Sequence, residues 1–505
     1  MTETMLDLLA VGADDAPAIG APDRPWMTYG GLRTQVEAAA SALRSAGVAQ
    51  DDRVAIVLPN GAHMATAFLS AARAAVAAPL NPAYGEAEYT FYLEDLNAKA
   101  LIVGDDYDGP ALAAAASQGV AVVRLSDAGG AAGAFALDID GAADPGAPGA
   151  QDTALILHTS GTTSRPKIVP LLHRNVTQSA RNIAASLKLS ADDRSMNVMP
   201  LFHIHGLIAS LSASLSAGAS IWCAPGFNAL KFFSQVTEAD PTWVTAVPTM
   251  HQAILSRAGR NRDAIDAARL RFLRSSSASL PAPVMEEVTA TFGVPVVEAY
   301  GMTEAAHQMC SNPVEPGLQV PGAVGLAAGP EVMTADEADN RLLPKGALGE
   351  VVISGPNVTP GYESNPEANE KNFFEADGKR WFRTGDQGAF DEKGYLTLTG
   401  RLKEIINRGG EKISPLEVDA VILEIDAVKQ AVCFALPHPK LGEDIAAAVV
   451  LEEGADMTEK AVRDHIAGRL AAFKVPSKVL MLEDIPKGAT GKIQRIGLAE
   501  KLGLS

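Results

Sequence analysis

The chain has 505 residues, which is too long for one compact core, so we expect two or three structural units. Apolar residues make up 47% and charged residues 20% of the chain, as in an ordinary globular protein. The formal net charge of -18 argues against a diffuse basic surface for nucleic acid or anionic membrane, so anionic ligands must be held by local groups such as backbone amides and a few placed cations.

The cysteines and the chain ends carry no signal for export. The three cysteines are far apart and form no C-x-x-C pair, which predicts neither a disulfide framework nor a structural zinc site. The N-terminal residues lack a basic and then apolar leader, and the apolar run 65–80 is too short to span a bilayer. The C-terminal GLS differs from the SKL address. We therefore expect a cytoplasmic monomer or homodimer that binds neither membrane nor nucleic acid.

Predicted helices and strands alternate along the first part of the chain. In chain order they are a helix at 32–46 that Gly47 ends, a strand at 53–58, a helix at 62–77 and strands at 101–104 and 120–125. The alternation predicts an α/β fold in which helices cover parallel-rich sheets. The stretch 127–149 is rich in Ala, Gly and Asp and is predicted to be a surface loop.

The composition changes after about Leu398, where Lys and Glu become more frequent. Strands are predicted at 429–436 and 446–451, and a helix at 459–472. We therefore expect a large N-terminal domain with a smaller β subdomain over residues 1–399, and a small mobile α+β domain over residues 400–505. The polar segment that joins them suits a hinge.

The segment LILHTSGTTSRPKIV, Leu155–Val169, is the strongest signal for chemistry. A predicted strand enters a cluster of hydroxyls, a glycine and one lysine, which can surround a polyphosphate with donors and one positive charge. The cluster consists of Thr159, Ser160, Gly161, Thr162, Thr163, Ser164 and Lys167. The spacing is not that of a Walker A loop, and a Ser/Thr-rich turn is the alternative interpretation.

This segment resembles the phosphate loop of the acyl-adenylate-forming superfamily, which includes acyl-CoA synthetases, peptide-synthetase adenylation domains and firefly luciferase. Four more motifs follow in the family order, and the resemblance covers essentially the whole chain. They are EAYGMTE at 298–304, WFRTGD at 381–386, GRLKEIINRGGEKISPLEVD at 400–419 and PKGATGKIQR at 486–495. The resemblance implies that ATP, Mg²⁺ and coenzyme A are used to convert a carboxylic acid first to its adenylate and then to its thioester.

Adenylation replaces the oxide leaving group of a carboxylate by AMP, and negative charge gathers on the α-phosphate and on departing pyrophosphate. The resemblance implies that Glu304, with Thr159, holds Mg²⁺, that Thr303 contacts the α-phosphate, and that Lys492 reaches the carboxylate. It implies a nucleotide site made of Ser277, Ala278, Glu298, Ala299, Tyr300, Asp386 and Arg401. Without the other motifs, Asp386 would be read as a turn residue and Lys492 as a surface lysine.

Thioester formation requires a second arrangement, because Lys492 would obstruct the thiol. The family rotates its small domain about one polar residue, which the resemblance places at Lys403. The rotation would bring 408–412, which includes the predicted cofactor-binding residue Lys412, to the site. Gly409 and Gly410 have no side chains, so they would let the thin pantetheine arm pass close to the backbone. Lys474 is expected to contact the nucleotide end of coenzyme A, or else to be a solvated helix-end lysine.

The choice of acid is predicted from the positions of the acyl pocket at which this chain differs from many relatives. Many relatives carry a Gly-rich segment where this chain has Arg274-Ser275-Ser276-Ser277-Ala278-Ser279. Serine in place of glycine reduces the volume of the acyl pocket and adds hydroxyl groups to its wall. The candidate acid-binding residues are Arg274, Ser276, Ser277, His205 and His307, with His203 in the catalytic set. Such a pocket suits a short acid with a second anionic group. The alternatives are a packing role for His205, a backbone bond for His307, a structural carboxylate partner for Arg274, and a strand-end role for His158.

The combination HTSGTTSRPK, LFHIHG, RSSSASL and EAYGMTEAAH resembles the oxalate–CoA ligase subgroup, from which Ile168 departs where that subgroup has Gly. Oxalate is therefore the predicted acid. Three alternatives stay open: a ligase for another short acid such as malonate, since one methylene changes binding only modestly; a carrier-protein-directed adenylating enzyme; and a non-catalytic nucleotide-binding protein.

Overall fold

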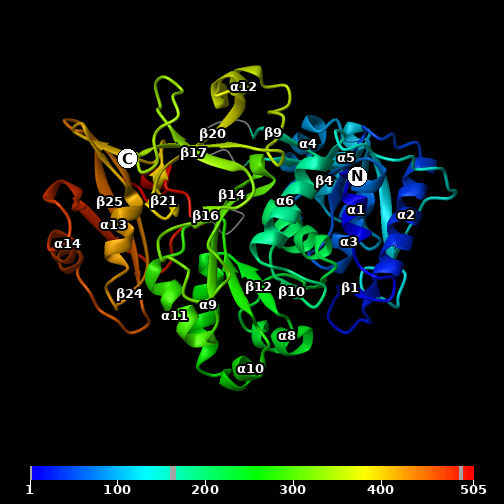
Figure 1. The fold of residues 1–505 in the computed structure, drawn as a ribbon, viewed down its shortest axis with the longest axis horizontal. Coiled ribbons are helices and arrows are strands. Elements are labelled where there is room, and N and C mark those ends of the chain that lie inside the picture. The colour runs from blue at the N-terminus through cyan, green and yellow to red at the C-terminus, as the bar shows by residue number, and fades with distance from the viewer. Residues whose placement is uncertain (1–2, 160–165, 488–492, 505) are drawn as a thin grey trace.

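The computed structural model describes residues 3–159, 166–487 and 493–504. Four sheets organise these residues. Figure 1 shows the seven-stranded sheet with its helices at one end of the molecule and the C-terminal residues at the other. The seven-stranded sheet has the order β7 (Phe135–Leu137), β6 (Ala121–Asp127), β5 (Ala100–Gly104), β3 (Arg53–Val57), β4 (Val76–Pro79), β8 (Thr153–His158) and β9 (Ile168–Leu172).

The nine-stranded sheet forms the centre of the molecule. Its order is β16 (Leu326–Ala327), β15 (His307–Ser311), β14 (Val296–Met302), β13 (Phe272–Ser275), β12 (Trp243–Ala246), β10 (Arg194–Asn197), β11 (Ser220–Cys223), β1 (Pro17–Gly20) and β2 (Met27–Thr28). The six strands from β14 to β1 in this order are parallel, and the edge strands are antiparallel. The carboxyl ends of the parallel strands therefore share one edge, where α/β proteins place their ligands.

Two smaller sheets complete the fold. The first contains β17 (Glu331–Ala335), β18 (Gly349–Ser354), β20 (Lys379–Phe390), β19 (Phe373–Ala376) and β21 (Leu396–Arg401), all antiparallel. The second contains β23 (Glu411–Ile413), β22 (Ile406–Arg408), β25 (Gly442–Leu451), β24 (Val428–His438) and β26 (Lys478–Met481). The predicted α/β architecture with an added β subdomain and a smaller α+β unit is confirmed.

Helices cover both large sheets and fill the layer between them. The remaining helical bounds are α1 (Met5–Leu9), α2 (Tyr29–Ser45), α3 (Ala62–Ala74), α4 (Glu86–Asp95), α5 (Pro110–Gln118), α6 (His173–Ser186), η1 (His205–Ser212), α7 (Ala213–Ser216), α8 (Phe232–Ala239), α9 (Pro248–Ala258), α10 (Arg262–Ala267), α11 (Ala282–Phe292), η2 (Thr303–Ala305), α12 (Pro366–Asn372), α13 (Pro415–Ile422), α14 (Glu459–Ala467), η3 (Ala472–Lys474) and α15 (Leu498–Lys501). Among the described residues, no helix is long and apolar enough to cross a membrane.

The hydrophobic core has separate parts before and after residue 400. The largest cluster joins both large sheets through α3, α6 and η1. Two further clusters contain only residues between Ile406 and Leu504. Each part therefore buries apolar surface of its own, which is the physical requirement for a separate folding unit.

Local signals explain where elements begin and end, and where prediction was wrong. The hydroxyl of Thr28 accepts a hydrogen bond from the Gly31 N–H and caps α2, which ends before Gly47 at a φ of +82°. The predicted helix over 62–77 ends at Ala74, since the next residues form the buried strand β4. An alanine-rich run suits either state, and tertiary burial decides between them.

Two other predicted bounds are also corrected. The predicted loop over 127–149 contains the short strand β7, which pairs antiparallel with β6. The helix predicted over 459–472 stops at Ala467, because Gly468 follows, and a separate 3₁₀ turn covers Ala472–Lys474. Glycine weakens helix propagation by about 1 kcal/mol relative to alanine, which favours an end at this position.

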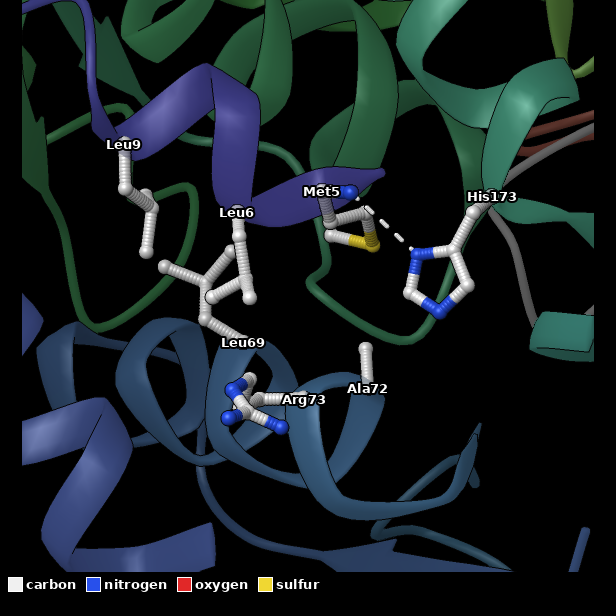
Figure 2. Close-up of a pocket in the computed structure, with 7 residues that line it drawn as sticks. All are labelled: Met5, Leu6, Leu9, Leu69, Ala72, Arg73 and His173. Atoms are coloured by element: carbon white, nitrogen blue, oxygen red, sulfur yellow. Dashed lines mark hydrogen bonds between the residues drawn. The ribbon is translucent and has the colours of Figure 1, made fainter. Parts of the chain in front are cut away.

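The N-terminal helix α1 packs against α3 and α6 over a small apolar pocket. Figure 2 shows the lining side chains, which are Met5, Leu6, Leu9, Leu69, Ala72, Arg73 and His173. The Met5 N–H donates to Nδ1 of His173 over 3.2 Å. Burial lowers the pKa of His173 to about 4, so this ring is neutral at neutral pH and can accept that bond.

Candidate functional site

Three of the predicted segments lie where strands of the two large sheets end. Strand β8 leads into the phosphate loop, β13 into the serine-rich segment, and β14 into the turn η2 that carries Thr303 and Glu304. Part of the prediction lies outside the described residues, namely Ser160, Gly161, Thr162, Thr163, Ser164 and Lys492. The described site is therefore the rim of the phosphate loop, the β14 turn and the acyl side.

The two ends of the phosphate loop are joined to each other. The Thr159 N–H donates to the Lys167 carbonyl over 3.0 Å, and the Lys167 N–H donates to Thr159 Oγ1 over 3.2 Å. Burial is the main cause that lowers the pKa of the Lys167 ammonium, the charge of Glu304 opposes the shift, and the charges of Lys403 and Lys371 add to it. The cation at the end of the loop is thus partly desolvated, which strengthens its attraction for phosphate.

Glu304, Tyr362 and Lys167 form a contiguous group at the β14 turn. The Tyr362 hydroxyl donates to Oε1 of Glu304 over 2.7 Å, and the Lys167 Nζ lies 4.4 Å from the centre of the Tyr362 ring. Burial, followed by the charge of Glu304, raises the pKa of Tyr362, so its hydroxyl remains a donor. Tyr362 therefore fixes the orientation of the carboxylate that was predicted to hold a metal.

The donor set at Glu304 fits Mg²⁺ only together with phosphate. Within the described parts of the chain, no group of three or more His, Cys, Asp or Glu side chains is arranged to hold a metal ion. Magnesium in nucleotide enzymes is held by one or two carboxylates plus substrate phosphates, which suits the single buried carboxylate of Glu304. The predicted contribution of Thr159 stays a prediction.

Asp386 lies between Tyr300 and Arg401. The Tyr300 hydroxyl donates to Oδ2 of Asp386, and Arg401 Nε donates to Oδ1 over 3.0 Å. The cross-strand register of β20 and β21 places Asp386 directly opposite Arg401. The Asp386 charge raises the pKa of Arg401, and burial with that same charge raises the pKa of Tyr300. The buried carboxylate is thus held in place as an acceptor, which is the chemistry that ribose hydroxyls need.

Arg274, Thr245, His205 and Ser277 form a chain of side-chain contacts, here called the Arg274 cluster. Arg274 Nη1 donates to Thr245 Oγ1 over 3.3 Å, and Thr245 Oγ1 lies 2.6 Å from His205 Nε2. His205 Nδ1 lies 3.0 Å from Ser277 Oγ. Arginine can only donate, and Arg274 Nη1 also lies 3.5 Å from His205 Nε2, so Nε2 is the acceptor. The Thr245 hydroxyl then donates to Nε2, and Nδ1–H donates to Ser277 Oγ. The Ser277 hydroxyl proton is left to point at a ligand.

Arg274 is a buried cation without an anionic partner. Its side chain is completely buried on β13, and it makes no salt bridge with any residue that the structure describes. Burial lowers its pKa to about 9, which still leaves it charged at neutral pH. The alternative that Arg274 pairs with a structural carboxylate is therefore wrong for the described residues. A buried charge is costly unless an opposite charge meets it, so this position is suited to an anionic ligand.

His307, Ser276 and His203 differ in how directly they face the Arg274 cluster. The rings of His205 and His307 have centres 5.2 Å apart, which places His307 beside the cluster. Ser276 donates its hydroxyl to the Ala299 carbonyl over 2.7 Å and so braces β13 against β14. His203 Nδ1 accepts from the His205 N–H over 3.3 Å. The structure thus gathers the predicted acyl residues, with Ser276 serving the backbone.

Backbone geometry at the β14 turn depends on one glycine. Ala306 and His307 have φ angles of +48° and +99°, so the chain reverses sharply after η2. A Cβ at Gly301 would lie 2.0 Å from the His307 carbonyl oxygen. Glycine at this position therefore allows β14 and β15 to approach, which brings His307 back toward the site.

Sequence reasoning missed four residues that organise the site, namely Thr245, Gln308, Tyr362 and Leu280. Gln308 accepts from Arg274 Nη2, and the Leu280 N–H donates to Glu298 Oε1 over 2.8 Å. Burial raises the pKa of Glu298 to about 8, so this brace is largely uncharged at neutral pH. A threonine in a strand or a glutamine after a turn carries no signal of its own, and only their neighbours in space reveal their roles.

The residues predicted to bind coenzyme A lie in the C-terminal part. Lys474 Nζ contacts both Glu417 carboxylate oxygens at 2.6 and 2.7 Å. Gly409 and Gly410 have φ angles of +63° and +98° in the turn between β22 and β23. Lys412 Nζ lies 3.7 Å from Glu337, which belongs to the N-terminal part. In this arrangement Lys474 is already paired, so a ligand phosphate would have to displace Glu417.

Two family models match the chain. The AMP-binding enzyme model covers residues 9–363, and the AMP-binding enzyme C-terminal domain model covers residues 417–492. Proteins named oxalate–CoA ligase from Arabidopsis thaliana and Saccharomyces cerevisiae are 44% and 42% identical to the chain. These alignments cover 97% and 91% of this chain and 96% and 88% of the relatives.

The comparison of structures agrees with the comparison of sequences. The crystal structure of ATP-bound MatB from Rhodopseudomonas palustris superimposes with a TM-score of 0.88 at 31% identity. The match covers 99% of both chains. The arrangement of sheets described above therefore has a full-length counterpart in a protein that was crystallised with ATP.

Proposed function

The chain belongs to the AMP-binding enzyme family, and on that premise we propose that it is an AMP-forming acid–CoA ligase whose acid is oxalate. Arg274 is the observation that carries the proposal, because a fully buried guanidinium without a carboxylate partner among the described residues suits an acid with a second negative charge. The names of the two relatives reported above support the same acid.

In the proposed first step, one carboxylate of oxalate attacks the α-phosphorus of ATP. A bond forms between the carboxylate oxygen and the α-phosphorus, and the bond to the bridging oxygen of pyrophosphate breaks. The second carboxylate lies against Arg274, with the Ser277 hydroxyl donating to it and His205 orienting that hydroxyl. Holding the distal carboxylate fixes the direction of the reacting one, which is how positioning lowers the barrier.

The nucleotide is held at the opposite side of the site. Asp386 accepts hydrogen bonds from the ribose hydroxyls, with Arg401 and Tyr300 keeping the carboxylate oriented. Lys167 and the phosphate loop surround the phosphates, and Thr303 contacts the α-phosphate. Mg²⁺ held by Glu304 and phosphate oxygens would supply positive charge as pyrophosphate departs.

Thioester formation completes the proposed reaction. The sulfur of coenzyme A attacks the acyl carbon of the adenylate, a carbon–sulfur bond forms, and the bond to the AMP oxygen breaks as the thiol proton is lost to water. We assign residues 1–399 and 400–505 to two domains with a hinge at Lys403. Rotation at this hinge moves Lys492 out of the active site and brings the Gly409–Gly410 turn into it. Lys412 and Lys474 then face coenzyme A. The cytoplasm is the compartment we predict for this enzyme.

The products and an acid panel test the proposal. Purified protein with ATP, Mg²⁺ and coenzyme A should convert oxalate, malonate and acetate at different rates, with oxalate fastest. AMP, pyrophosphate and oxalyl-CoA should appear in equal amounts, as measured by chromatography. Faster turnover of malonate or acetate would contradict the choice of acid, and formation of ADP and phosphate would contradict the reaction itself.

A further inference from the structure

We propose that Gln308 determines acid selectivity by holding Arg274 in place without cancelling its charge. Gln308 is completely buried at the start of β15, and its Oε1 accepts from Arg274 Nη2 over 3.3 Å. The inference rests on the proposed function, since it concerns how the same site distinguishes acids of different charge. Gln308 acts through Arg274 and is therefore a positioning residue.

Two other parts of the fold fix the orientation of the Gln308 amide. Its Nε2 donates to Ser186 Oγ on α6 over 2.9 Å and to the Ala328 carbonyl after β16 over 3.1 Å. A carbonyl can only accept, so the nitrogen of the amide must face Ala328. The amide oxygen is thereby directed to Arg274, and the side chain cannot exchange its two ends without losing two hydrogen bonds.

Arg274 retains most of its binding capacity in this environment. Its guanidinium contacts are with neutral acceptors, Thr245 and Gln308, both at 3.3 Å, with His205 Nε2 at 3.5 Å. These distances exceed the usual 2.9–3.0 Å for such bonds, so each contact is weak. Arg274 Nε has no hydrogen-bond partner among the described residues. A cation fixed by weak neutral contacts keeps its full charge for a ligand.

A glutamate at position 308 would remove that property at almost constant size. Its carboxylate would replace the amide oxygen beside Arg274 and form a charge-assisted pair. The distal carboxylate of oxalate would then compete with a permanent internal anion. A monocarboxylic acid brings no second charge, so it would lose little. The neutral amide therefore favours acids that carry a second negative charge over those that do not.

The experiment compares Gln308→Glu with Gln308→Met, which keeps the volume without adding charge. Gln308→Glu should lower kcat/KM for oxalate by about 100-fold or more, as loss of a buried charge pair does, while KM for ATP changes less than about twofold. Gln308→Met should lower kcat/KM by about tenfold or less and should keep the preference for oxalate over acetate. Equal losses in the two variants would overturn the inference and indicate packing alone.

A second variant keeps the inference testable if Gln308→Glu does not fold, which thermal unfolding would reveal. Arg274→Met removes the same uncompensated charge and should produce the same acid profile as Gln308→Glu. A preserved preference for oxalate over acetate in Arg274→Met would overturn the inference. The proposed function fails separately if the unmodified protein does not favour oxalate; if it favours malonate, the same comparison is made between malonate and acetate.

Discussion

At the scale of single residues, the site combines charged groups with neutral side chains that orient them. Tyr362 orients Glu304, Thr245 and Gln308 hold Arg274, and a largely uncharged Glu298 supports Leu280. None of these supporting groups adds an opposite charge to Arg274, whereas Lys167 has the charge of Glu304 nearby. Arg274 therefore remains available for an acid, which is the electrostatic preorganisation that catalysis requires.

Tyr362→Phe tests the orienting role of the hydroxyl on Glu304. The ring beside Lys167 remains, but the bond to the carboxylate is lost, and a hydrogen bond to a charged group contributes about 1.5–3 kcal/mol. We expect the Mg²⁺ concentration for half-maximal rate to rise about tenfold with little change in KM for oxalate. Titration with Mg²⁺ at saturating ATP measures this, and a variant altered only in KM for oxalate would refute it.

At the scale of elements, buried histidines join helices to their neighbours in the neutral form. His173 at the start of α6 accepts from Met5 of α1, and His251 on α9 bonds the Arg274 carbonyl over 3.1 Å. Burial lowers the pKa of each ring to about 4. The α1 helix is short and has little stability of its own, so its contact with His173 helps to hold it in place.

These histidines predict a loss of stability in mild acid. Their folded pKa lies below the unfolded value of about 6.5, so the unfolded chain binds protons first as the pH falls. The contribution of each ring to the free energy of unfolding is fully present above about pH 6.5. It falls by about 3 kcal/mol for each ring as the pH decreases to 4. Melting temperatures measured across this range should fall, and His173→Asn should flatten the dependence. An unchanged slope in that variant would show that other groups cause it.

At the scale of the whole molecule, the C-terminal part has a core of its own and meets the N-terminal part through polar contacts. Lys412 faces Glu337, and the Gln252 amide donates to the Lys429 carbonyl. Exposed ion pairs of this kind contribute about 0–1 kcal/mol, so they permit one part to move against the other. Such weak contacts are what a rotation about Lys403 would need.

Lys492→Ala tests the two proposed arrangements. Adenylation should fall strongly, because the cation that we propose to meet the carboxylate and α-phosphate is removed, while thioester formation from preformed acyl-adenylate should remain largely intact. Pyrophosphate release measures the first half-reaction and acyl-CoA formation measures the second. Similar losses in both would contradict the assignment of Lys492 to one arrangement.

The amino-acid sequence alone was sufficient for the fold class, the family and the order of the motifs. Short apolar runs and long motifs depend on residues that are close in the chain, so they predicted β3 and β5 and placed Thr303 and Glu304 in one motif without tertiary information. It was not sufficient to separate α3 from β4, because alanine-rich segments suit both states until neighbouring strands bury them.

Only the tertiary structure showed that Thr245 and Gln308 act together with the predicted residues Arg274 and His205. Arg274, Thr245, His205 and Gln308 come from β13, β12, η1 and β15, and no spacing in the chain relates them. Whether a buried arginine is neutralised depends on what the fold places around it, and here the fold supplies neutral oxygens. The charge state of the acyl site is therefore a property of three-dimensional packing.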